Sequence, residues 1–274
     1  MTSQQNPSQP SQCPMKTETL LYLVSSLLLA GVVVLSITDA NVSLFLWLNQ
    51  HLQVLPDTFW SNMTFVADTL FAVAVLGSVA SLRPAMFNSG LVLLILGALF
   101  VQGLKPALDI LRPAAVLGTD AVHIIGPVLK NHSFPSGHSF TALATAGLVL
   151  LYSPFTGSRG ALVSVLVLGT ALTAALSRAA VGAHWPMDIL VGSAAGLLFA
   201  ILAKTLTEKL SWLQSRGIEW FSAALLTITC ISLIFHESNY PATRPLCVIS
   251  GVLSTALLLR YGWQTWQARQ ARAG

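Results

Sequence analysis

Three short segments of this 274-residue chain carry side chains suited to binding and cleaving an anion. The first is KPALDILRP, in which Lys105 and Arg112 stand seven positions apart. In a continuous helix that spacing is about two turns, or about 10 Å along the axis, so both cations would lie on nearly the same face. Cations at the end of an oily helix are costly unless they face an anion or water. The alternative is a pair that extends to the lipid headgroups.

The second segment is SFPSGHSF, which precedes an apolar stretch predicted to be a helix over 138–153. Ser136 after Pro135 is a suitable N-cap. A helix start offers free backbone N–H groups and a partial positive charge, which suits a phosphate. Gly137 would let that backbone approach the ligand closely, with His138 beside it in the first turn. The alternative is an ordinary capped helix with an incidental histidine.

The third segment is SRAAVGAHWPMD, before a helix predicted over 186–203 with Pro186 in its first turn. Asp188 follows His184 by one turn, so its carboxylate can reach one imidazole nitrogen. That contact would fix the tautomer and leave the other nitrogen as a nucleophile. Arg178 adds a guanidinium with fork geometry suited to phosphate oxygens. The alternative is a His–Asp cap at a helix start.

Together these residues supply positive charge, backbone donors, one oriented nucleophile and a second histidine. This combination indicates phosphoryl transfer through a covalent phosphohistidine, in a pocket that mainly stabilises charge. Asp109 and Asp120 form no acidic cluster that would hold magnesium. The three cysteines, at 13, 230 and 247, have no spacing suited to zinc. We therefore predict no metal and no cofactor.

The elements that position these groups are predicted to be membrane helices. The chain is 54% hydrophobic and only 9% charged, whereas soluble domains are about 25% charged. Most of its oily segments approach the ~20 residues that a helix needs to cross the hydrocarbon layer. The stretch 41–60 is either interfacial, because it holds Trp47 and Trp60, or a short re-entrant helix. Eight spans are predicted: 20–37, 64–82, 88–108, 138–153, 160–179, 186–203, 218–236 and 246–262.

The expected fold class is all-α, a polytopic integral membrane helix bundle. The chain divides into a disordered cytoplasmic tail at 1–19, a six-span core at 20–210, an additional helix pair at 211–265 and a short basic tail at 266–274. Lys and Arg favour the cytoplasmic side, which predicts that both termini are cytoplasmic and that all three segments open on the outer face. On that basis the outer basic residues are Lys105, Arg112, Lys130, Arg178 and Arg244.

The three segments resemble the signature of the type 2 phosphatidic acid phosphatase superfamily. The matching patterns are Lys-x6-Arg-Pro, Pro-Ser-Gly-His and Ser-Arg-x5-His-x3-Asp. The resemblance implies a metal-independent phosphatase in which His184 attacks phosphorus, Asp188 orients it and His138 protonates the leaving oxygen. It also implies a set of phosphate-binding residues: Lys105, Arg112, Ser136, Gly137 and Arg178.

Membrane proteins of this superfamily usually have six spans, so the helix pair at 211–265 is additional. It is either a packing accessory or, through its loop HESNYPATRP, a part of the lipid entry or headgroup site. The loop residues considered for that role are His236, Glu237 and Arg244.

The expected function is hydrolysis of the terminal phosphate of a membrane lipid phosphate or diphosphate. Examples are undecaprenyl diphosphate, phosphatidylglycerol phosphate, phosphatidic acid and lipid A phosphate. The alternatives are a lipid phosphotransferase and a non-catalytic lipid transporter. The expected partners are the lipid substrate and the bilayer, which in a bacterium would be the inner membrane with the site on its periplasmic face. Nucleic acid is not an expected partner, because the basic residues are scattered.

Overall fold

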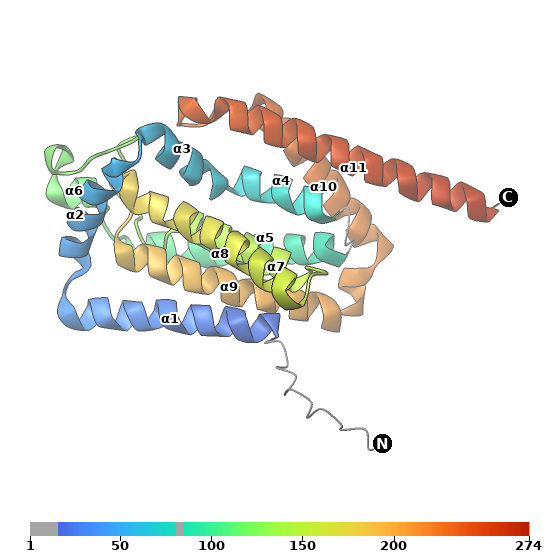
Figure 1. Ribbon diagram of the computed structural model, residues 1–274, viewed down its shortest axis with the longest axis horizontal. Helices are drawn as coiled ribbons and strands as arrows, with labels where there is room; N and C mark the ends of the chain where they lie inside the picture. Colours follow the sequence, from blue (N-terminus) through green and yellow to red (C-terminus); the bar gives the residue numbers. More distant parts are fainter. Residues whose placement is uncertain (1–15, 81–84, 274) are drawn as a thin grey trace, which may run out of the picture.

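The computed structural model describes residues 16–80 and 85–273, and all regular structure in these ranges is helical (Figure 1). Longer helices run along one common direction, and short ones gather at one end of the bundle (Figure 1). The α-helices are α1 (Thr17–Thr38), α2 (Asn41–His51), α3 (Asp57–Val66), α4 (Thr69–Ala80), α5 (Ala85–Leu108), α6 (Pro113–Leu117), α7 (Gly137–Leu151), α8 (Gly157–Ala180), α9 (Pro186–Lys209), α10 (Arg216–Phe235) and α11 (Arg244–Ala273). Short 3₁₀ turns are η1 (Leu52–Val54), η2 (Thr119–Ala121), η3 (Ser211–Gln214) and η4 (Pro241–Thr243).

Helices occupy all eight of the predicted oily segments, with differences at the ends. α1 begins at Thr17, so residues 17–19 are helical and do not belong to the predicted tail, whose residues 1–15 lie outside the described ranges. At the other end, α11 extends through the described part of the predicted basic tail. Apolar stretches alone set the prediction, whereas a helix continues into polar residues as long as its backbone hydrogen bonds are made.

The prediction of one continuous helix over 64–82 is wrong, because the chain bends within this range. α3 and α4 meet at an angle of 61°. Asp68 lies at the bend, and its carboxylate accepts a hydrogen bond from the N–H of Leu70 at 2.8 Å. That cap starts a second helix in a new direction. The stretch 41–60, left open between an interfacial and a re-entrant arrangement, forms α2, η1 and the first turn of α3 at the end where the short helices gather (Figure 1).

α7 and α9 form the centre of the bundle, and small residues let their backbones touch. A Cβ atom added to Gly192 would collide with the carbonyl oxygen of Ser136, and one added to Gly196 would collide with that of Phe140. Further along, a Cβ on Gly147 would lie 2.7 Å from that of Ala200. Small residues of this kind permit close helix packing in membranes. The starts of α7 and α9 are therefore held at a short, fixed separation.

The helix pair α10–α11 packs against α4, and α10 also contacts α5. Its apolar side chains join the cluster that fills the space between α4, α5, α7 and α9. Cys230 and Cys247 are fully buried here as free thiols, in keeping with their expected role as small apolar residues. The pair is thus an integral part of the packed molecule.

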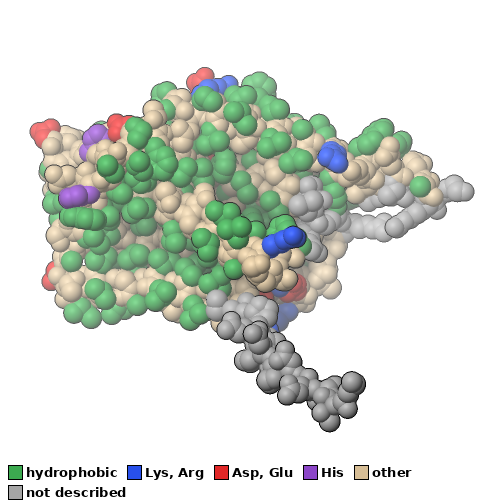
Figure 2. Space-filling view, in the orientation of Figure 1, with side chains coloured by type: hydrophobic (Ala, Val, Ile, Leu, Met, Phe, Trp, Pro, Cys, Tyr) green, Lys and Arg blue, Asp and Glu red, His purple; other side chains and the backbone are tan. Residues whose placement is uncertain are grey.

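The surface between the two ends of the bundle is largely hydrophobic (Figure 2). Leu27 on α1, Leu99 on α5 and Val165 on α8 are 73%, 69% and 69% exposed. Among the described residues, five helical segments are long and apolar enough to cross a membrane, or six with the bent α3–α4 pair. α7 and the stretch Trp220–Phe235 are shorter apolar helices. The chain is therefore a multi-pass integral membrane protein.

Candidate active site

The three predicted segments meet at the end of the bundle where the short helices gather. Arg112 reaches this place by a route that the sequence did not predict. α5 ends at Leu108, Asp109 adopts a left-handed conformation (φ 40°), and Arg112 is the extended residue before α6. Lys105 and Arg112 therefore do not share a helix face, and that prediction is wrong. The reason is local, since Pro113 disfavours helical geometry at the residue before it.

The Arg112 guanidinium is buried and held by backbone carbonyl groups. Nε donates to the carbonyl of Asn131 at 2.8 Å, Nη2 to that of His132 at 3.3 Å and Nη1 to that of Ala183 at 2.9 Å. Nη1 also lies 3.1 Å from Nε2 of His184. Arg112 therefore connects the 109–136 loop to the loop that carries His184.

His184 lies in the short loop between α8 and α9 and is 2% exposed. Its Nδ1 is 3.4 Å from Oδ2 of Asp188, so Nδ1 carries the proton and Nε2 presents a lone pair toward Arg112. Burial, followed by the charges of Arg112, Arg178 and Lys105, lowers the pKa of His184 well below 6.5. The ring is therefore neutral at physiological pH, as a nitrogen nucleophile requires.

Asp188 has two roles that the sequence analysis treated as alternatives. Its Oδ2 accepts a hydrogen bond from the N–H of Trp185 at 3.0 Å, which caps α9, and the same oxygen faces His184. It also accepts a hydrogen bond from Oγ of Ser133. These donors fix the carboxylate and hence the imidazole. Ser133 is a positioning residue that the sequence analysis did not identify.

Ser136 is the N-cap of α7, as predicted. Its Oγ accepts from the N–H of Ser139 at 3.3 Å, and its own N–H donates to the carbonyl of Asp188 at 3.1 Å. The hydroxyl of Ser136 therefore caps α7, and its N–H joins the start of α7 to that of α9. The N–H groups of Gly137 and His138 belong to the first turn, where a helix provides no carbonyl acceptor. These two residues present the donors that suit an anion.

Arg178, the last cation of α8, is 2% exposed. Its Nη1 donates to Oγ1 of Thr64 at 3.3 Å and to the hydroxyl of Tyr240 at 3.4 Å. Oγ1 of Thr64 is in turn 2.8 Å from Oγ of Ser177. Nε of Arg178 is buried without a hydrogen-bond partner among the described residues. A buried, unpaired guanidinium nitrogen is costly in free energy and suits a site that receives an anion.

Asn49 of α2 hydrogen-bonds to the end of α8, directly before the loop that carries His184. Its side-chain nitrogen donates to the carbonyls of Ala179 and Ala180 at 2.9 and 3.2 Å and to that of His123 at 3.0 Å. Its side-chain oxygen accepts from the N–H of His123 at 2.8 Å. One side chain thus ties the C-terminal end of α8 to the 109–136 loop. The stretch 41–60 therefore supports the site.

The charge of the pocket is positive. Arg112 contacts His184, Lys105 and His138 line a common cavity, and the charges of Arg112, Arg178 and Lys105 all lower the pKa of His184. Asp188 supplies one compensating carboxylate. Within the described ranges, Lys105 forms no ion pair, and no group of three or more His, Cys, Asp or Glu side chains could hold a metal. The pocket can therefore offset a phosphate dianion with side chains alone.

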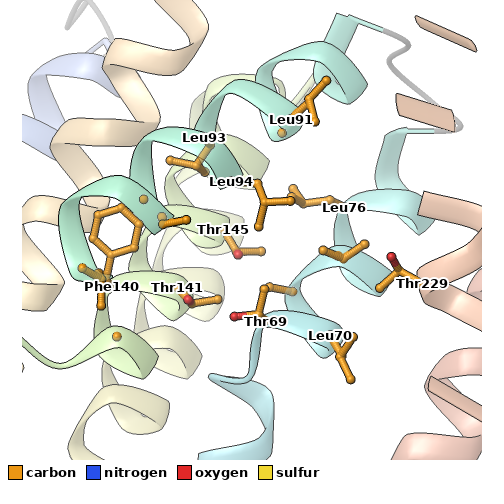
Figure 3. A pocket seen from close by; sticks show the side chains of 18 of the residues that line it. Thr69, Leu70, Leu76, Leu91, Leu93, Leu94, Phe140, Thr141, Thr145 and Thr229 are labelled. Carbon is orange, nitrogen blue, oxygen red and sulfur yellow. The ribbon is translucent and has the colours of Figure 1, made fainter. Parts of the chain in front are cut away.

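An apolar cavity of about 510 Å³ adjoins the pocket. Lys105, Gly137 and His138 line one part of it, and the rest is bounded by α4, α5, α7 and α10. Figure 3 shows the hydrocarbon side chains that line it, with the hydroxyl groups of Thr69, Thr141, Thr145 and Thr229 among them. A cavity of this size and character can take part of a hydrocarbon chain.

Fold and site together define a membrane helix bundle with an anion-binding pocket at one end and a neutral, oriented histidine in it. Residues 87–212 match the model of the PAP2 superfamily. Among proteins of curated function, no match to the chain is found.

Two solved structures are similar to the chain. The crystal structure of Aquifex aeolicus LpxE has a TM-score of 0.52 at 24% identity, over 60% of this chain and 93% of that chain. The structure of a transmembrane PAP2 type phosphatidylglycerolphosphate phosphatase from Bacillus subtilis has a TM-score of 0.49 at 23% identity, over 72% of this chain and 98% of that chain. The first similarity confirms the predicted all-helical membrane fold.

Proposed function

We propose that the chain is an integral-membrane lipid phosphatase that hydrolyses the terminal phosphate of a lipid phosphate or diphosphate. The observation that carries this proposal is the orientation of His184. Its Nδ1 faces Asp188, and its Nε2 points at the Arg112 guanidinium, where a phosphate would sit. The PAP2 superfamily match over 87–212 supports the same chemistry.

In the first step, Nε2 of His184 attacks phosphorus and forms an N–P bond, while the bond from phosphorus to the lipid oxygen breaks. Arg112 shifts its Nη1 donor from the imidazole to a phosphate oxygen. Lys105, Arg178 and the N–H groups of Gly137 and His138 bind the other oxygens. The bound phosphate dianion offsets the cations of the pocket, so that His138 can carry a proton in the complex. It gives this proton to the departing lipid oxygen, which leaves as an alcohol or as a lipid phosphate.

In the second step, water attacks the phosphohistidine. His138, now neutral, accepts a proton from the water as the new P–O bond forms and the N–P bond breaks. Inorganic phosphate leaves, and His184 returns to its neutral form. Asp188 remains ionised throughout and stabilises the imidazole when it carries positive charge.

The substrate class follows from the cavity beside the pocket. Lys105 and His138 line both, so a phosphate bound at His184 places its attached chain at the opening of the apolar space. The pocket itself lies at one end of the hydrophobic bundle, at the depth of a lipid headgroup. The opposite end carries Lys204, which pairs with Glu18 at 3.8 Å. By the distribution of basic residues we assign that end to the cytoplasm and the site to the outer face.

The test is a phosphate-release screen with the purified full-length protein in detergent micelles. The panel contains phosphatidic acid, phosphatidylglycerol phosphate, undecaprenyl diphosphate and lipid A phosphate, each with and without a chelator. We expect release of inorganic phosphate from at least one lipid, at a rate that the chelator does not change. No release from any of them would contradict the proposal. Transfer of labelled phosphate to an added lipid alcohol would identify a phosphotransferase instead.

A further inference from the structure

The loop between α10 and α11 reaches the phosphate pocket, although it lies outside the segment 87–212 that matches the superfamily. From the sequence, His236, Glu237 and Arg244 of this loop are candidates for contact with a lipid. Arg244 instead holds the loop together, because its Nη1 donates to the carbonyl of His236 at 2.8 Å. The residue that enters the site is Tyr240.

The backbone of Tyr240 is fixed by its own turn. Its N–H donates to Oγ of Ser238 at 3.0 Å, and its carbonyl accepts from Oγ of Ser238 at 2.9 Å and from the N–H of Thr243 at 2.9 Å. Thr243 is fully buried. The side chain is therefore presented from a rigid base and not from a free loop.

The Tyr240 ring packs where the two loops of the site meet. Gly126 of the 109–136 loop lies directly against it, so that a Cβ at this glycine would collide with the ring. The ring also packs against a cluster that includes Trp60, Val181 and Ala183. Ala183 is the residue whose carbonyl holds Arg112. This packing fixes the direction in which the phenol points.

The hydroxyl of Tyr240 lies 3.4 Å from Nη1 of Arg178. Among the described residues, only the side chains of Tyr240 and Thr64 accept hydrogen bonds from the Arg178 guanidinium. Because both act on Nη1, Nε and Nη2 keep their donors for an anion.

We infer that Tyr240 is a positioning residue for phosphate binding: its hydroxyl orients Arg178, and the α10–α11 pair thereby completes the active site. This inference rests on the proposed function, since the anion in question is the phosphate of the substrate or product. The additional helix pair thus contributes to catalysis through Tyr240, a residue outside the segment 87–212 that matches the superfamily.

The test uses Tyr240→Phe, which removes the hydroxyl and keeps the ring that packs on Gly126. The matched control is Tyr22→Phe, on α1 and 51% exposed. One hydrogen bond to a charged group is lost, so we expect kcat/KM to fall about 10-fold and inorganic phosphate to inhibit about 10-fold less well. The thermal unfolding temperature should match that of the wild type, and the control should match it in every measurement.

A double-mutant cycle with Arg178→Lys shows whether the hydroxyl acts through Arg178. A lysine has no fork to orient, so adding Tyr240→Phe to that variant should change the phosphate affinity less than 2-fold. An unchanged Tyr240→Phe single variant, or the same 10-fold loss in both backgrounds, would overturn the inference. A wild type that cleaves no lipid would refute the proposed function, whereas its affinity for inorganic phosphate, measured by calorimetry, would still test Tyr240.

Discussion

The phosphate pocket and the apolar cavity share Lys105 and His138 but are built on opposite principles. In the pocket, directional hydrogen bonds fix each group: three carbonyl oxygens hold Arg112, and Ser133 and the Trp185 N–H hold Asp188. In the cavity, hydrocarbon side chains define only a volume (Figure 3). Changes of single atoms should therefore lower the reaction rate in the pocket, whereas only changes of side-chain size should matter in the cavity.

The largest effect should come from removing the nucleophile. His184→Ala is expected to lower kcat by about 10⁴-fold or more, because no other group among the described residues of the pocket is oriented to attack phosphorus. The measurement is phosphate release, together with trapping of labelled phosphoprotein after an alkaline quench. The control is His51→Ala, an exposed histidine on α2 whose Nδ1 bonds the carbonyl of Trp47. Labelled phosphoprotein in the His184→Ala variant would remove His184 from the mechanism.

A smaller and selective effect is expected in the cavity. Thr229→Trp on α10 would fill part of the space, so activity on a long-chain lipid phosphate should fall about 10-fold while that on a dihexanoyl analogue stays unchanged. Ile228→Trp is the matched control, because Ile228 is 61% exposed on the same helix and does not line the cavity. An equal loss on both chain lengths would mean that the cavity does not hold the chain.

The smallest effect concerns pH. Because the pKa of His184 is lowered, the imidazole becomes protonated, and loses its nucleophilic lone pair, only at a pH well under 6.5. The acid limb of the kcat/KM profile should therefore lie below pH 6.5. Arg112→Gln removes one cation that lowers this pKa, so its acid limb should move upward by up to about one pH unit. The titration of the substrate is the same in both measurements and cancels. Coincident acid limbs would show that Arg112 does not tune His184.

Local rules were enough to predict much of the site from the sequence. Ser136 caps α7, Pro186 begins α9, and Asp188 faces His184 one turn away, as residue types and spacing indicated. Each of these features depends on residues within four positions of one another. The eight oily segments were likewise found from apolar length alone, although the bend at Asp68 was not.

The errors and omissions involve the path of the chain over longer distances. Arg112 left the expected helix face because α5 ends at Leu108, and its position is set by loop carbonyls about 20 residues away. Ser133, Thr64 and Tyr240 were missed because they act on groups 55, 114 and 62 positions away in the sequence. A hydroxyl group that contacts a residue distant in the sequence leaves no recognisable pattern in the sequence.

The geometry of the active site depends on the contact between α7 and α9 deeper in the helix bundle. Gly192, Gly196 and Gly147 are not among the proposed catalytic residues, yet by letting α7 and α9 touch they set how close the starts of these two helices lie. Catalytic precision in this molecule thus depends on the smallness of residues that take no part in the reaction. A larger side chain at Gly192 or Gly196 would push α7 and α9 apart and so displace the active-site residues, although it would stand outside the pocket.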